Sequence, residues 1–116
     1  MKARKIEFKV VESKDQNMPG TFRYEDGLIM IAESTAVDGR GNSLGMSSDE
    51  ILRAVEIKSE IKKAGDAVIL SEDHYQWLLS KLNFQMRWRV DTEVVAQFIK
   101  DFRAAPEVEV AEAKKD

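Results

Sequence analysis

The sequence predicts a single α+β domain in which an N-terminal antiparallel sheet of three to four strands packs with three helices. Three observations support this fold class. The 116-residue chain has the length of one ordinary domain. Its first third alternates apolar and polar residues with the period of strands, and most of the remainder repeats apolar residues at helical spacing. We expect the domain to span residues 1–106, followed by a charged tail over 107–116 in which 107–110 add a strand.

The first predicted strand spans residues 5–11. Ile6, Phe8 and Val10 alternate there with charged residues, so that one face is apolar and the other polar. The following residues, 13–20, are rich in turn formers and predict a connection rather than a continued strand.

A β-hairpin is predicted around Asp26-Gly27, a dipeptide that accommodates the positive φ angles of a type I′ turn. Residues 21–24 alternate and form its first strand. Residues 28–33 are nearly all apolar and form its second, which we expect to be a central strand. Residues 35–47 then form a glycine-containing loop, either mobile in isolation or held by something outside the fold.

The first predicted helix begins at Ser47 or Ser48, because serine caps helix N-termini. Asp49 and Glu50 follow in the first turn, where negative charge is favourable. Apolar residues then recur at helical spacing as far as Gly65, which we expect to end the helix in a left-handed conformation.

The rest of the chain predicts a short strand and two more helices. Residues 67–70 form the strand, Ser71 begins a second helix, and residues 91–93 cap a third, which Pro106 stops. The predicted core takes residues from each element: Ile6, Phe8, Val10, Leu28, Met30, Val55, Ile61, Ile69, Leu78, Leu82, Phe98 and Phe102.

The composition excludes several classes of function. The chain has no Cys and one His, which excludes thiolate nucleophiles and cysteine metal sites and argues against a Ser–His triad. With 18 Lys and Arg against 21 Asp and Glu, the formal charge of −3 gives no basic footprint for nucleic acid or an anionic membrane. We therefore predict a non-enzymatic protein without cofactor, metal or small-molecule substrate.

The N-terminus and the apolar runs predict a cytoplasmic location. The charged start, residues 1–5, is not followed by the apolar core of a signal peptide. The longest apolar run, residues 28–32, is far shorter than a membrane span.

Residues 38–42 are a first candidate binding segment, with Arg40 and Asn42 as its partner-binding residues. The glycines suggest a phosphate or calcium loop, but neither pattern is complete. A plain connecting loop and a loop ordered by a partner remain the two interpretations. The helix that follows also has free amide groups at its start, which favour an anion.

Arg87, Trp88 and Arg89 form the second candidate, the one place where basic and aromatic residues interleave. Three interpretations stay open. The segment is an extended connector with Met86 and Trp88 packed inward, an interface anchor, or a contact for single-stranded nucleic acid.

Val108 and Val110 form the third candidate, because their alternation with glutamates suits a strand added to a sheet edge, in the same subunit or in a neighbour. His74 lies beside Asp73, which raises general acid–base catalysis as a possibility. Adjacent helical residues diverge by about 100°, however, so we expect His74 to be a surface residue near the helix start.

Three runs resemble small, mostly uncharacterised proteins of tailed bacteriophages that are encoded among morphogenesis genes. The resemblance is one of apolar spacing and helix caps, and it covers residues 50–65, 68–79 and 98–106. It implies a virion component, an assembly factor or a small host-interaction protein, in the host cytoplasm or in the virion. It carries over no catalytic residue.

We therefore predict an interaction or assembly protein with a protein partner or with self-association, and not a partner of membranes or nucleic acid. The alternative is a small regulator that contacts nucleic acid or a host enzyme through Arg87-Trp88-Arg89.

Overall fold

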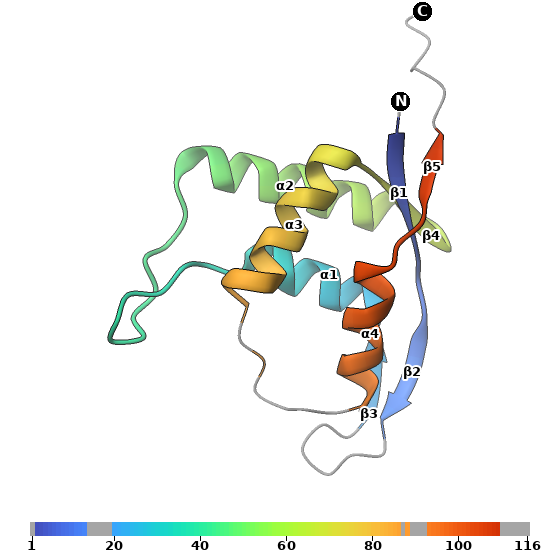
Figure 1. Ribbon diagram of the computed structural model, residues 1–116, viewed down its shortest axis with the longest axis horizontal. Helices are drawn as coiled ribbons and strands as arrows, with labels where there is room; N and C mark the ends of the chain where they lie inside the picture. Colours follow the sequence, from blue (N-terminus) through green and yellow to red (C-terminus); the bar gives the residue numbers. More distant parts are fainter. Residues whose placement is uncertain (1, 14–19, 87, 89–92, 110–116) are drawn as a thin grey trace, which may run out of the picture.

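The computed structural model describes residues 2–13, 20–86, 88 and 93–109. Within these ranges the chain forms four helices, a three-stranded antiparallel sheet and a two-stranded sheet, which confirms the α+β class (Figure 1). The helices gather on one side of the strands, and the connection over residues 34–47 projects away from both.

The three-stranded sheet joins strands that are far apart in the sequence. Its order is β4 (Ala67–Ser71), β1 (Lys2–Glu7) and β5 (Glu107–Glu109), with antiparallel pairing throughout. Ala3 of the central strand lies opposite Val108 of β5. Residues 107–109 thus add a strand to a sheet edge within their own chain.

The predicted strand over residues 5–11 is divided between two sheets, which corrects the expectation. β2 (Val10–Ser13) leaves the first sheet and pairs with β3 (Gly20–Arg23). The break falls at Phe8 and Lys9, whose backbone groups form hydrogen bonds with residues that belong to neither strand pair. Phe8 N donates to the turn before β4 at 2.8 Å, and Lys9 O accepts from the residue after β3 at 3.0 Å.

The segment around Asp26-Gly27 is a helix, α1 (Tyr24–Glu33), and the hairpin prediction is wrong. Glu25 and Asp26 lie in its first turn, where carboxylates interact favourably with the helix dipole. Its buried side chains follow helical rather than alternating spacing, and therefore share one face: Tyr24, Leu28, Ile31 and Ala32.

Gly27 permits a close approach rather than a turn. A Cβ atom at this position would lie 2.8 Å from Phe98 Cζ and 3.0 Å from Phe22 Cζ. Its absence lets α1 pack directly on two aromatic rings, in a helix where glycine itself costs about 1 kcal/mol relative to alanine.

The helix predicted from Ser47 is confirmed as α2 (Ser48–Lys63). Ser47 Oγ accepts from Glu50 N at 3.2 Å, and Glu50 Oε1 accepts from Ser47 N at 3.1 Å, which completes a capping box. The predicted left-handed end at Gly65 is wrong, because the last turn closes at Ala64 in an extended conformation and Gly65 has no positive φ.

The next strand and the second predicted helix begin as predicted. β4 covers residues 67–71 and leads into α3 (Glu72–Phe84), where Ser71 Oγ accepts from His74 N at 3.1 Å. The third predicted helix is α4 (Glu93–Arg103), and two residues of its predicted cap, 91–92, lie outside the described residues.

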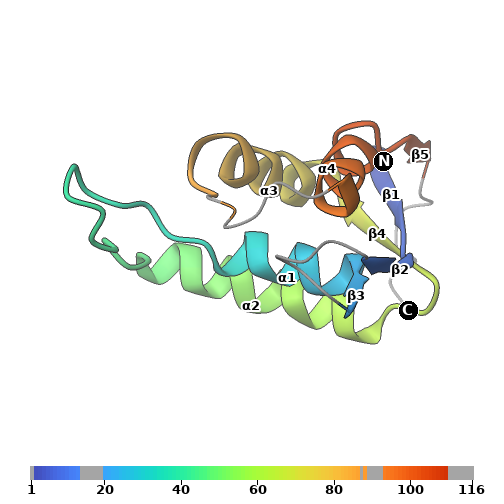
Figure 2. The same ribbon diagram turned by 90° about the horizontal axis from the view of Figure 1, so that it is seen from below.

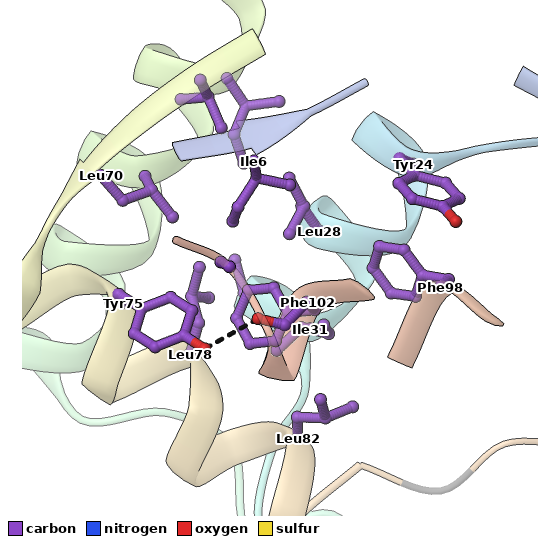
Figure 3. Packing of buried hydrophobic residues seen from close by; sticks show 14 of the residues in the cluster. Ile6, Tyr24, Leu28, Ile31, Leu70, Tyr75, Leu78, Leu82, Phe98 and Phe102 are labelled. Carbon is purple, nitrogen blue, oxygen red and sulfur yellow. Dashed lines mark hydrogen bonds between the residues drawn. The ribbon is translucent and has the colours of Figure 1, made fainter. Parts of the chain in front are cut away.

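The four helices and the first sheet meet in one core (Figure 3). Phe98 of α4 packs edge-on against Tyr24 of α1, with ring centroids 5.0 Å apart. Tyr75 of α3 donates its hydroxyl to Phe102 O at 2.7 Å, so its one polar atom is satisfied inside the core.

Most of the predicted core is confirmed. Phe8 is half-buried. Seven predicted residues are buried: Ile6, Leu28, Ile61, Leu78, Leu82, Phe98 and Phe102.

Four predicted core residues are exposed, and each error has a local cause. Val10 belongs to β2 rather than to the first sheet. Ile69 alternates with its two buried neighbours in β4 and so faces away from the helices. Met30 lies on the exposed face of α1, whose residues were expected to form a strand. Val55 lies away from the face of α2 that carries Ile57.

Candidate interaction surface

Helix α2 lies along one edge of the molecule, with α1 and α3 on its inner side (Figure 2). Its buried residues are Ala54, Ile57 and Ile61, which recur three or four positions apart and face the core. The opposite face of α2 has no other element of the described chain against it.

Three large aliphatic side chains are exposed on α2, with Leu52 opposite the buried residues and Ile51 and Val55 nearer the border of the buried face. Ile51, Leu52 and Val55 are 49%, 68% and 59% exposed. Ile51 and Val55 are one helical turn apart, and Leu52 is three positions from Val55, so the three are neighbours on the helix surface. We call these three residues the outer patch.

The surroundings of the outer patch differ at its two ends. Asp49 lies in the first turn, whereas Lys62 and Lys63 lie in the last turn. Beyond Val55, toward the C-terminal end, is a shallow depression of about 440 Å³, lined by Val55, Lys58, Ser59, Lys62 and Lys63. The face is therefore acidic and apolar at its start, and hollowed and basic at its end.

Side-chain contacts fix α2 against α1. Lys58 Nζ donates to Glu33 Oε2 of α1. This contact, together with the buried residues of the inner face, holds the outer patch in one orientation.

Arg53 joins α2 to α3. Its guanidinium lies 3.3 Å from Asp73 Oδ2 and 5.8 Å from the centre of the Trp77 ring. Asp73 therefore pairs with α2 and not with its sequence neighbour His74.

His74 is not the surface residue that we expected. Its side chain is 12% exposed and lies between two glutamates of α2, with Nδ1 3.2 Å from Glu60 Oε2 and Nε2 3.8 Å from Glu56 Oε1. The sequence prediction failed because it considered only the helix that carries His74. The imidazole links α3 to α2.

The loop that carries Arg40 and Asn42 closes on itself. Val37 and Ser43 form an isolated bridge, and Asp38 Oδ1 accepts from Arg40 N at 2.8 Å and Asn42 N at 3.0 Å. Backbone hydrogen bonds from Asn42 and Arg40 hold the pKa of Asp38 below its ordinary value. Both candidate side chains are exposed at the tip of this small hairpin, which lies apart from β5 (Figure 1).

Trp88 is half-buried and packs edge-on against Phe98, with ring centroids 6.3 Å apart. This agrees with the interpretation in which Trp88 packs inward. Arg87, Arg89 and Val110 lie outside the described residues. Of the candidates that the structure describes, Arg40 and Asn42 lie in the loop, Trp88 lies against Phe98 and Val108 lies in β5, so these four do not form one site.

A second cavity, of about 320 Å³, lies beside the first turn of α1. Tyr24 donates its hydroxyl to Asp101 Oδ2 at 2.5 Å, and Lys9 Nζ lies 3.5 Å from the same oxygen. Burial, followed by the hydrogen bond to Asp101, raises the pKa of Tyr24, and the hydrogen bond from Tyr24 lowers the pKa of Asp101. Because the polar groups of Tyr24, Asp101 and Lys9 form hydrogen bonds with one another, we assign them a role in the fold rather than in binding a ligand.

Sequence reasoning missed the outer patch because it assigned Val55 to the core. One feature of the sequence indicates the outer patch. Leu52 lies across the helix from Ala54 and Ile57, so its apolar side chain has no place on the face that those residues form.

No family model, curated protein or solved structure matches this chain. Among the described residues, no helix has both the length and the apolar character needed to cross a membrane. The same residues hold no group of three or more His, Asp or Glu arranged to bind a metal ion.

Proposed function

We propose that this protein is a non-enzymatic binding protein that presents the outer patch of α2 to another protein. The observation that carries this proposal is the combination of three adjacent exposed aliphatic side chains with a helix fixed on its other face. Contiguous exposed apolar surface rimmed by polar residues marks interaction sites in folded proteins.

The chemistry of the patch favours a protein over the other classes of partner. Aliphatic side chains offer no ring on which a base stacks. Helices that lie on membranes carry a predominantly basic polar face, whereas α2 has four acidic and four basic residues. A protein surface with apolar side chains and charges of both signs is the matching partner.

The resemblance to small proteins of tailed bacteriophages suggests a setting for this binding. In that setting the contact would be a step of virion assembly, or an encounter with a host protein. We include this setting in the proposal, and it rests on the resemblance alone.

Site-specific photo-crosslinking in the cells that produce the protein tests the proposal. A photoreactive residue at position 52 is expected to form a discrete covalent adduct with a protein. The matched control is the same residue at Ser80, an exposed position on α3. Absence of an adduct at position 52, or equal adducts from both positions, would contradict a binding role for this face.

A further inference from the structure

We infer that the protein bound at the outer patch is a second copy of this chain, paired antiparallel through α2 about a two-fold axis near Val55. The inference rests on the proposed function and names its partner. A two-fold contact uses the same surface on both copies, so that surface must complement itself. The charge and the shape of α2 both satisfy this condition.

The opposite charges at the two ends of α2 favour the antiparallel direction. Reversal about Val55 brings Asp49 of one copy beside Lys62 and Lys63 of the second, and the same pair recurs on the other side of the axis. A parallel arrangement would instead place like charges side by side. The helix dipoles also favour the antiparallel direction, because the positive end of each helix then lies beside the negative end of the other.

The shape of the outer face of α2 also fits an antiparallel pair. Ile51 and Leu52 precede Val55, whereas the depression lies on its C-terminal side and is lined by Ser59 and the lysine stems. Antiparallel pairing therefore places the apolar side chains of each copy over the depression of the other. Lysine stems are themselves apolar and cover such side chains while their amino groups stay in water.

The expected dimer is weak and concentration-dependent. A helix of 16 residues is about 24 Å long. One face of it buries less than the about 800 Å² per partner that a standard interface needs. The two Glu56 carboxylates also come near the axis, and their repulsion weakens the dimer further.

The solution mass of the purified chain is the first test. Sedimentation at low salt, from about 1 µM to about 1 mM, covers the range of a weak interface. We expect the mass to rise from 13.2 kDa toward twice that value and to stop there. A monomer throughout, or growth beyond two copies, would overturn the inference.

Charge reversal tests the direction of pairing. Asp49→Lys is one variant, and Lys62→Glu with Lys63→Glu is the other. Each variant alone places like charges across the axis and is expected to remain monomeric where the wild type dimerises. A mixture of the two restores opposite charges at both contacts, so it is expected to form a mixed dimer. A mixture that stays monomeric while the wild type dimerises would overturn the antiparallel arrangement.

Leu52→Lys tests whether the dimer uses the outer patch. We expect it to weaken dimerisation at least about tenfold, because a positive charge would replace an apolar side chain and lie over the lysine-lined depression of the other copy. The control is Ile69→Lys, which introduces the same charge at an exposed residue of β4 and is expected to leave dimerisation unchanged. Equal effects of the two variants would contradict an interface on α2.

Different experimental results would contradict the second-copy inference and the proposed function. An adduct from position 52 with a mass other than two copies, together with a monomeric purified chain, would overturn the second copy and keep the binding role. The absence of any adduct from position 52 would overturn the binding role itself. An adduct of two copies, together with a dimer in solution, supports both.

Discussion

At the scale of single residues, the bond between Tyr24 and Asp101 ties α1 to α4. Asp101 Oδ2 accepts from the Tyr24 hydroxyl, and Asp101 Oδ1 accepts from Gln97 Nε2 at 2.8 Å. Both bonds favour the ionised carboxylate and contribute to its lowered pKa. The contact is therefore a pH-dependent part of the fold.

The sign of this dependence follows from the pKa shifts. Because folding lowers the pKa of Asp101, its contribution to the free energy of unfolding is complete above the ordinary carboxyl value, about 3.9, and is lost as the pH falls below it. Because folding raises the pKa of Tyr24, stability also falls as the pH rises above about 10.

Tyr24→Phe tests the contact. We expect it to lower the free energy of unfolding near neutral pH by about 1.5–3 kcal/mol, the usual worth of a hydrogen bond to a charged group. It should also reduce the loss of stability as the pH falls below about 4. Urea unfolding at several pH values measures both effects. If the variant had the same acid dependence as the wild type, Asp101 would not draw its low pKa from Tyr24.

Gly27 shows how one missing side chain positions a helix. Gly27→Ala would gain about 1 kcal/mol of helix propensity, but it places a Cβ atom 2.8 Å from the Phe98 ring. Overpacking of this kind costs about 1–3 kcal/mol, so we expect a net loss of stability of about 1 kcal/mol.

The control for Gly27 is Gly65→Ala, since no atom lies within 4 Å of a Cβ built at Gly65. Gly65→Ala should unfold at the same urea concentration as the wild type, or at a higher one. A second check is Gly27→Ala in a Phe98→Leu background, where the smaller side chain should reduce the cost. A stabilising Gly27→Ala would show that α1 moves freely away from the ring.

At the scale of elements, the sequence predicted those whose signals are local. α2 and α3 begin at serines that accept hydrogen bonds from their first turns, as expected. The strand between them was also predicted, because a short apolar run lies between the end of one helix and the cap of the next.

α1 was not predicted because two signals conflict in it. Asp26-Gly27 is a strong hairpin signal when only four residues are considered. The helical spacing of the buried residues of α1 becomes decisive only when Phe98, more than seventy positions later, packs against Gly27. Tertiary packing thus overrides the local preference, which single-sequence reasoning does not anticipate.

The candidate surface was missed for a related reason. Helical periodicity identifies an apolar stripe on α2, but Val55 and Ile51 lie at the border of that stripe. Whether these two residues are buried depends on where α1 and α3 lie, and the sequence of α2 alone does not give those positions. The same holds for His74, whose glutamate partners come from another helix.

At the scale of the whole molecule, one ring connects segments that are distant in the sequence. Phe98 is fully buried and contacts the rings of Phe22, Tyr24 and Trp88, at 5.4 Å, 5.0 Å and 6.3 Å between centroids. It thereby joins α4 to the second sheet, to α1 and to the segment after α3. Loss of this ring should weaken the whole fold rather than one element.

Phe98→Ala is expected to lower the free energy of unfolding by about 3–5 kcal/mol, since it removes a large buried ring and leaves a cavity beside the rings of Phe22, Tyr24 and Trp88. Phe84→Ala is the matched control, because that ring is 77% exposed at the end of α3 and its loss should cost less than about 1 kcal/mol.

Urea unfolding followed by circular dichroism and by tryptophan fluorescence measures both variants. The two signals should shift together for Phe98→Ala, because the helices and Trp88 depend on the same ring. A shift in fluorescence alone would mean that Phe98 stabilises only the surroundings of the two tryptophans, Trp77 and Trp88, and that the rest of the core folds without it.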